Sequence, residues 1–223
     1  DEEYLQLFGG SVEAAQAYLE LIVAAADAIH GRDAGVRLQL VYSRLWTSND
    51  PWTASGTQTQ LTELREHWQS QMGGVFRDST HLLSGRDLGG GIAWIGGLCT
   101  SYSYGVSANL SGFFPTPMVD HSHQNWDPYV FAHELGHTLG SRHTHDTLHY
   151  DPPLDDCWID DAVGPCSMAW GGTIMSYCHQ CAGGLANIAL SLHPEVSARI
   201  SATVGTAACA SDGPCVEDCN GNG

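Results

Sequence analysis

Between residues 133 and 143, four side chains with metal-site chemistry and one glycine are spaced as on a helix that ends at that glycine. His133 and His137 are four residues apart, so on an α-helix they project from one face and can bind one ion. Glu134 is rotated by about 100° from His133, so it flanks the ion and does not bind it. Gly140 lets the chain leave the helix in a left-handed turn, after which His143 can return as a third ligand. The spacing therefore predicts a fold built around one metal ion.

The ligand set indicates which metal chemistry to expect. Three neutral imidazoles leave zinc a free coordination position, which is typical of a catalytic site and not of a structural one. Zinc lowers the pKa of its bound water to about 7, and the Glu134 carboxylate stands where it can remove the proton. Any one of these histidines alone would be interpreted as an ordinary core or surface imidazole, but the five positions together favour the metal site.

Composition excludes several other functions. The chain has 223 residues, 43% hydrophobic and 15% charged, which indicates a globular protein of one large or two small domains. Its eight basic residues are all arginine and are outnumbered by 25 Asp and Glu residues, which gives a formal charge of −17. This balance argues against a basic nucleic-acid surface and a polybasic membrane tether, and the lack of lysine excludes Schiff-base chemistry. We expect a monomer with neither nucleic acid nor membrane as a partner.

The eight cysteines indicate whether the protein is found in a reducing or an oxidising compartment. Cys178 and Cys181 form one C-x-x-C pair, and no second pair matches it at zinc-ribbon spacing. Disulfides are then the favoured interpretation, and disulfides belong to secreted or extracellular proteins. The chain shows no basic-then-apolar leader and no apolar run of roughly 18 residues, so we expect a processed piece of a secreted precursor.

Hydrophobic periodicity predicts an α/β or α+β protein. Ser11 is the expected N-cap of the first helix, and Gly31 is expected just beyond its end. Residues 141–177 are expected to be rich in loops. The predicted helices are Ser11–Ile29, Thr59–Gln71, Asn125–Leu139 and Pro194–Val204, and the predicted strands are Val36–Trp46, His81–Leu83 and Ile92–Ile95.

The string H-E-x-x-H-x-x-G-x-x-H at 133–143 resembles the signature of the metzincin clan of zinc endopeptidases. A second string, Gly171–Tyr177, resembles the clan's Met-turn, whose methionine lies beneath the zinc site; alone, Met175 would be interpreted as a core methionine. The resemblance implies a mixed twisted sheet, an active-site helix and a helical, loop-rich lower subdomain. We assign 1–208 to this domain and 209–223 to a Cys-, Gly- and Asn-rich linker or truncated calcium-binding module.

A third stretch, which begins at Gly91, is similar to the edge strand of the reprolysin (adamalysin) branch. In that branch this strand pairs with extended substrate. The free N–H and C=O groups of such an edge bind peptide backbone, so cleavage can tolerate varied side chains. For Ile92 and Ile95 taken singly, a plain buried strand is the competing interpretation. The expected substrate-binding residues are Gly91, Ile92, Ala93, Trp94 and Ile95.

The sequence also departs from the reprolysin pattern. An Asp usually follows the third histidine directly, whereas here Thr144 and His145 precede Asp146. Tyr177, two positions after Met175, is similar to the astacin and serralysin arrangement. Its hydroxyl is interpreted equally as a donor to the oxyanion of the tetrahedral intermediate or as a structural group of the turn.

The resemblance also implies disulfide pairings. Cys99 would pair with Cys209 and so join the edge strand to the end of the last helix. A second set forms two bridges around the loop under the site, with three pairings open: Cys157, Cys166, Cys178 and Cys181. The remaining two, Cys215 and Cys219, would pair with each other.

Three further patterns allow two interpretations each. Residues 146–161 hold six aspartates, which suit either a calcium site or a solvated acidic loop. His121 and His123 suggest either a second metal site or a solvent-facing approach to the helix. The last motif follows the opening of a calcium loop or is a linker turn: Asp218, Asn220, Asn222 and Gly223.

Together these features favour a secreted zinc endopeptidase that cleaves extended protein or peptide substrates with a zinc-bound water activated by Glu134. Calcium is a second candidate cofactor. The alternative from another class is a non-catalytic adhesion or binding module that retains zinc, and Glu134 argues against it because a structural site needs no such carboxylate. A metal-dependent amidase for small substrates is a third interpretation, which the edge strand disfavours.

Overall fold

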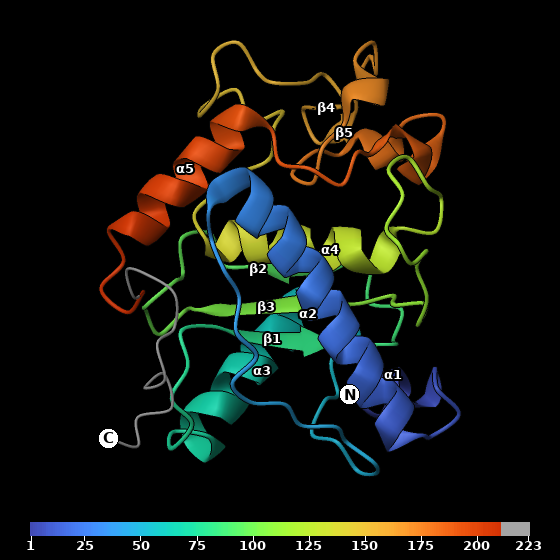
Figure 1. Ribbon diagram of the computed structural model, residues 1–223, viewed down its shortest axis with the longest axis vertical. Coiled ribbons are helices and arrows are strands. Elements are labelled where there is room, and N and C mark those ends of the chain that lie inside the picture. Colours follow the sequence, from blue (N-terminus) through green and yellow to red (C-terminus); the bar gives the residue numbers. More distant parts are fainter. Residues whose placement is uncertain (211–223) are drawn as a thin grey trace.

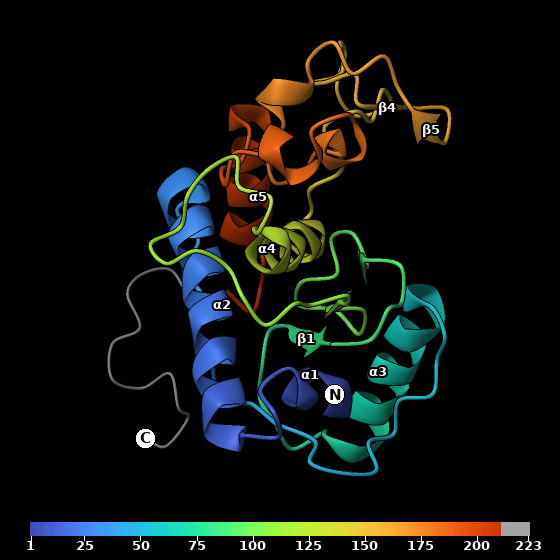
Figure 2. The same ribbon diagram turned by 90° about the vertical axis from the view of Figure 1, so that its right-hand side faces the viewer.

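Helix α4 (Trp126–Thr138) runs through the middle of the molecule, between a small sheet on one side and a loop-rich region on the other (Figures 1 and 2). The computed structural model describes residues 1–210. The sheet has the order β1 (Thr80–Leu83), β3 (Tyr104–Ser107), β2 (Gly91–Ala93). Strand β3 pairs parallel with β1 and antiparallel with β2, so the sheet is mixed and β2 is one of its edges.

Two hydrophobic clusters lie on either side of the sheet. Helix α3 (Thr57–Gln71) covers one face and packs on it through a set of buried apolar side chains: Trp52, Leu61, Leu64, Leu82, Tyr104 and Val106. The larger cluster joins α2 (Val12–Ala34), α4 and α5 (Pro194–Gly205) on the other side. Because α4 is enclosed by both the sheet and this cluster, every residue from 127 to 138 is buried.

The loop-rich region above α4 in Figure 1 is held together by covalent bonds more than by regular structure. Disulfides join Cys157 to Cys178 and Cys166 to Cys181. Bridges that close loops of such length contribute about 2–4 kcal/mol each. The short elements of the region are β4 (Trp158–Ile159), β5 (Ala162–Val163), η1 (Ala169–Gly171), η2 (Cys178–Gln180) and η3 (Gly184–Asn187).

The third disulfide, Cys99–Cys209, is the pairing that the family resemblance implies, and it ties the region after β2 to the end of the last helix. With its small mixed sheet, central helix and loop-rich region, the chain has the predicted α+β architecture. Cys215, Cys219 and the Asp218–Gly223 motif lie outside the described residues. In the described part of the chain, the longest helices are not apolar enough to cross a bilayer.

The first long helix begins as the sequence predicts and ends later. The Ser11 hydroxyl accepts a hydrogen bond from the Ala14 N–H at 3.2 Å, which caps α2. The predicted end near Gly31 is wrong, because the helix continues to Ala34 and Gly35 is the C-cap. The buried ring of His30 and the buried Ala34 keep this last turn packed against the core, which outweighs the low helix propensity of glycine.

The predicted strand Val36–Trp46 is wrong. These residues form no sheet, and the segment runs back along α2, with polar contacts in place of a ladder. The Leu38 N–H donates to Asp27 at 2.8 Å, and the Ser43 hydroxyl donates to Gln16 at 2.9 Å. Of the alternating apolar side chains, Val36 is buried and Leu38 half-buried, whereas Leu40 and Tyr42 are exposed, so a period of two does not indicate a sheet here.

Other boundaries differ less. The helix predicted over Asn125–Leu139 has those two residues as its caps, and the helix predicted from Thr59 begins at Thr57. The strand predicted over Ile92–Ile95 is shifted to Gly91–Ala93, so Ile95 lies outside it. Some short elements were not predicted from the sequence: α1 (Glu2–Gln6), β3, β4 and β5.

Candidate metal centre

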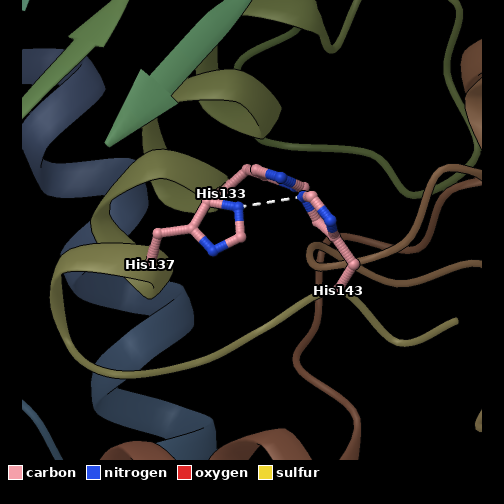
Figure 3. A group of neighbouring side chains, drawn as sticks. All are labelled: His133, His137 and His143. Atoms are coloured by element: carbon pink, nitrogen blue, oxygen red, sulfur yellow. Dashed lines mark hydrogen bonds between the residues drawn. The ribbon is translucent and has the colours of Figure 1, made fainter. Parts of the chain in front are cut away.

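The three histidines of the 133–143 motif converge as their spacing predicts (Figure 3). His133 and His137 project from one face of α4, and the chain leaves the helix at Gly140, whose φ is +95°. The Ser141 N–H then donates to the Gly136 carbonyl at 2.9 Å, which turns the chain back over the helix end. One ring nitrogen from each of His133, His137 and His143 lies within 4.8 Å of the other two.

Backbone carbonyls orient the rings of the two helical ligands. His133 Nδ1 lies 2.6 Å from the Ile174 carbonyl oxygen, and His137 Nδ1 lies 2.9 Å from that of Ser141. A carbonyl only accepts, so each Nδ1 carries its hydrogen and each Nε2 presents a lone pair. His137 Nε2 lies 3.0 Å from His143 Nε2 (Figure 3, dashed line), so the two nitrogens are close enough to bind one cation.

Burial keeps these imidazoles neutral. It lowers the pKa of His137 to about 4, and burial together with the neighbouring His137 ring lowers the pKa of His143 to about 2. The pKa of His133 is held well below 6.5, mainly by burial and then by the two other imidazoles. All three imidazoles are therefore neutral at neutral pH, which is the form that binds zinc.

Glu134 is the buried polar group that lacks a partner at this site. Its side chain is 4% exposed, and Oε2 makes no hydrogen bond among the described residues. Burial raises the pKa of its carboxyl well above the usual 4.5. An isolated buried carboxylate costs several kcal/mol unless a water or cation accompanies it. Three convergent lone pairs beside an unsatisfied carboxyl are what a zinc ion with one free coordination position requires, so the residues fit the metal.

Comparison with known proteins agrees with this geometry. A reprolysin model, described as metallo-peptidase family M12, matches residues 1–188. The chain belongs to metallopeptidase family M12. This family is zinc-dependent, and the His133, His137 and His143 group can hold the ion. The comparison with curated proteins found no match.

In this M12 metallopeptidase, the turn around Met175 lies directly beneath α4. Met175 is fully buried, and a Cβ atom on Gly136 would lie 2.5 Å from its sulfur, so only glycine fits at that point of the helix. The turn also supplies two anchoring carbonyls. That of Ile174 binds the His133 ring, and that of Met175 accepts the Thr144 N–H at 3.0 Å. Neither carbonyl was identified from the sequence, because backbone acceptors carry no sequence signal.

Thr144 occupies the position directly after the third histidine, where the reprolysin pattern has an aspartate. The Thr144 hydroxyl donates to Asp155, and Asp155 also accepts the Cys157 N–H at 3.0 Å. A carboxylate from eleven residues further along therefore anchors the loop after His143. The sequence offered no signal for this contact beyond the presence of six aspartates in that segment.

Aromatic rings pack around the histidines of the metal centre. The Tyr177 ring lies 4.3 Å from that of His143 and 5.9 Å from that of His133, measured between centroids. Its hydroxyl has no hydrogen-bond partner in the described part of the chain, and burial raises its pKa, so it keeps its proton at neutral pH. Trp158 of the β4–β5 hairpin packs edge-on against it at 5.4 Å.

Strand β2 lies against the metal centre with an unpaired edge. Ile92 pairs with Val106, the Ala108 N–H donates to the Gly90 carbonyl at 3.0 Å, and the Trp94 N–H donates to Tyr104. Backbone groups of an antiparallel strand alternate in direction, so those of Gly91 and Ala93 point away from β3 to the free edge. Of the five predicted substrate-binding residues, Gly91 and Ala93 are therefore the two whose backbone N–H and C=O groups face the free edge of the sheet. Beyond Ile95 the chain bonds to α4 instead, through the Gly96 N–H and the His137 carbonyl at 2.8 Å.

The structure places other candidate ligands away from one another. His121 stacks on Trp170 with centroids 4.3 Å apart and bonds to the Ala186 carbonyl, so it forms a packing contact. Within residues 1–210, the one other group with metal-like spacing is Asp155, Cys157 and Cys178, and its cysteines form a disulfide. Neither His121 nor His123 belongs to such a group in this part of the chain, which favours the interpretation of these residues as an approach to the helix over a second metal site. The aspartates at 155 and 156 are engaged by hydrogen bonds from the chain.

Proposed function

We propose that this M12 metallopeptidase is a secreted zinc endopeptidase in which Glu134 is the general base. The observation that carries the proposal is the position of the buried Glu134 carboxyl, between three neutral imidazoles and the unpaired edge of β2. Bound zinc would polarise the scissile carbonyl and lower the pKa of a water molecule to about 7. His133, His137 and His143 would hold it.

Substrate binding follows from the free edge of β2. An extended peptide that adds a strand there exchanges hydrogen bonds with the backbone groups of Gly91 and Ala93. An ideal Cβ on Gly91 would lie 2.5 Å from Glu134 Oε1, so the peptide bond opposite Gly91 is close to the general base. The chain needs no second copy to complete this site, and we propose that it acts as a monomer.

Proton transfer is assigned to two side chains. Glu134 removes a proton from the attacking water as the new C–O bond forms, and delivers that proton to the nitrogen as the C–N bond breaks. The Tyr177 hydroxyl, which is protonated and lacks a partner among the described residues, donates to the developing oxyanion. A carboxylic acid and a free amine leave, and Glu134 returns to its starting state.

Secretion is supported by the three disulfides, because such bonds persist in oxidising compartments. Two of them staple the loop-rich region next to the metal centre, which has little regular structure of its own. The family match supports a peptidase over the alternative of a binding module that retains zinc.

The test is to replace Glu134 by glutamine and alanine. Both variants should lose cleavage of casein and of quenched peptides, by a factor of about 10² to 10⁴ for the loss of a general base, while retaining about one zinc per chain. The matched control is Glu66→Gln, at an exposed position on α3. Cleavage by the wild type should stop with phenanthroline and return with zinc. Wild-type activity in Glu134→Gln would refute the assigned role.

A further inference from the structure

Asn109, two residues after β3, holds the segment that leads into the edge strand. Its Oδ1 accepts hydrogen bonds from three consecutive backbone N–H groups: those of Leu88 at 3.2 Å, Gly89 at 3.1 Å and Gly90 at 2.9 Å. Its Nδ2 donates to the carboxylate of Asp87. One side chain thus contacts all four residues of 87–90.

Besides these contacts, the segment is held by hydrogen bonds from the Thr57 and Ala108 N–H groups to the carbonyls of Leu88 and Gly90. Gly89 and Gly90 have φ values of +91° and +112°, and a glycine run loses more conformational entropy on ordering than any other residues would. Asn109 itself is left-handed, with φ at +58°, and its own N–H donates to the Arg86 carbonyl at 2.9 Å. Both sides of the contact are therefore shaped so that three N–H groups point at one oxygen.

This contact is connected to the helix that carries the metal ligands. The indole N–H of Trp126, at the start of α4, donates to the Ala108 carbonyl at 3.1 Å. The Ala108 N–H in turn donates to the Gly90 carbonyl at 3.0 Å. The residue after Gly90 is Gly91, whose backbone lies against the Glu134 side chain. A displacement of the glycine run would therefore move the substrate edge relative to the general base.

We propose that Asn109 is a positioning residue for substrate, which holds the Gly89–Gly91 run so that the free edge of β2 meets an extended peptide in register with Glu134. The proposal rests on the endopeptidase function proposed above. Asn109 touches neither substrate nor metal, and it acts through the backbone of the strand that does bind substrate.

The test compares two Asn→Gly substitutions. Asn109→Gly removes the side chain and tolerates the left-handed φ, so it removes the hydrogen bonds without backbone strain. Asn49→Gly is the matched control, because Asn49 has a φ of +52° and is exposed. Since Asn109-Leu110-Ser111 is an N-glycosylation sequence, the proteins are made in the oxidising periplasm of a bacterial host.

Two readouts separate positioning from a general structural role. For quenched peptides that extend several residues on both sides of the cleaved bond, kcat/KM of Asn109→Gly should fall about tenfold, since misplaced substrate loses rate steeply. For a substrate truncated to the residues next to that bond, the loss should be under about twofold. Zinc content should stay near one. Hydrogen exchange of the amides at 88–90 should accelerate in Asn109→Gly and not in Asn49→Gly.

A rescue variant tests the chemistry of the contact. Asp87→Asn combined with Asn109→Asp reverses the donor and acceptor of that pair and keeps an oxygen for the three N–H groups. It should recover most of the activity on long peptides. If Asn109→Gly does not fold, Asp87→Ala, which frees the amide to rotate, should show a weaker loss of the same length dependence.

The outcomes are distinguishable from those of the proposed function. A wild-type protein that cleaves no peptide refutes the endopeptidase, and hydrogen exchange at 88–90 still tests the contact. An active wild type whose Asn109→Gly variant, or Asp87→Ala where that fails to fold, cleaves long peptides normally overturns the inference. So does a loss that is equal for long and truncated substrates.

Discussion

Replacing Gly91 by alanine should move the Glu134 carboxylate without unfolding the protein. The added Cβ would lie 2.5 Å from Glu134 Oε1 and 2.6 Å from its Cγ, whereas ordinary contacts begin at 3.4 Å. The carboxylate therefore has to retreat by about 0.9 Å from β2, since a side chain yields more easily than a strand. The φ of Gly91 is outside the left-handed region, so alanine adopts this backbone without strain.

A misplacement of about 1 Å costs a catalytic group roughly a factor of 10² in rate, which corresponds to about 2.7 kcal/mol in the barrier. We expect kcat of Gly91→Ala to fall by about that factor, and KM to change less, because the backbone groups of β2 remain in place. Zinc content should stay near one per chain, since the three atoms nearest to the added Cβ all belong to Glu134 and none to a histidine.

The assay is cleavage of a quenched peptide, with zinc measured on the same sample and Tm recorded. Gly74→Ala is the matched control, because an added Cβ at Gly74 meets nothing within 4 Å. Wild-type kcat in Gly91→Ala would refute the reasoning that the contact with β2 sets the position of Glu134. A loss of bound zinc would show instead that the substitution disturbs the ligands.

Two further predictions concern stability. Asp127 is fully buried and accepts hydrogen bonds from the Tyr18 hydroxyl and from the Ser111 and Gly112 N–H groups. Asp127→Ala should therefore lower the free energy of unfolding, measured by urea titration, by about 3–5 kcal/mol. A loss below about 1 kcal/mol would contradict this prediction. Burial lowers the pKa of His30 to about 4, so the unfolded chain takes up this proton below pH 6.5 and the folded protein only near pH 4. The free energy of unfolding should thus fall as the pH drops through this window, by about 2 kcal/mol at pH 5 relative to pH 7. The metal-free His30→Gln variant should lack this part of the dependence of stability on pH. An unchanged pH dependence in that variant would contradict the assignment of this effect to His30.

Much of the candidate site could be predicted because its residues are neighbours in sequence. The positions of His133 and His137 on one helix face follow from a period of 3.6 residues, and the exit at Gly140 follows from the left-handed conformation that glycine allows. The N-cap Ser11 and the first-turn proline Pro194 are also local signals, and the structure has helices beginning at both places.

The predictions that failed depended on partners elsewhere in the chain. Alternation over Val36–Trp46 indicated a strand, but the segment lies along α2 and not beside another strand. Strand β3 was not predicted, although it occupies the centre of the sheet between β1 and β2. Whether a short apolar run becomes a strand is decided by the neighbour that its backbone groups meet, and periodicity carries little information about that neighbour.

The sequence by itself determined the three candidate metal ligands and the carboxylate proposed as general base, because these depend on residue types at fixed short spacings on one helix and the turn after it. Only the tertiary structure decided which cysteines pair and which β2 groups face outward. It also decided that Gly91 lies against Glu134 and that Asn109 holds the glycine run. Each of these is a contact between segments far apart in the chain, set by how helices and strands pack and not by the preferences of either segment alone.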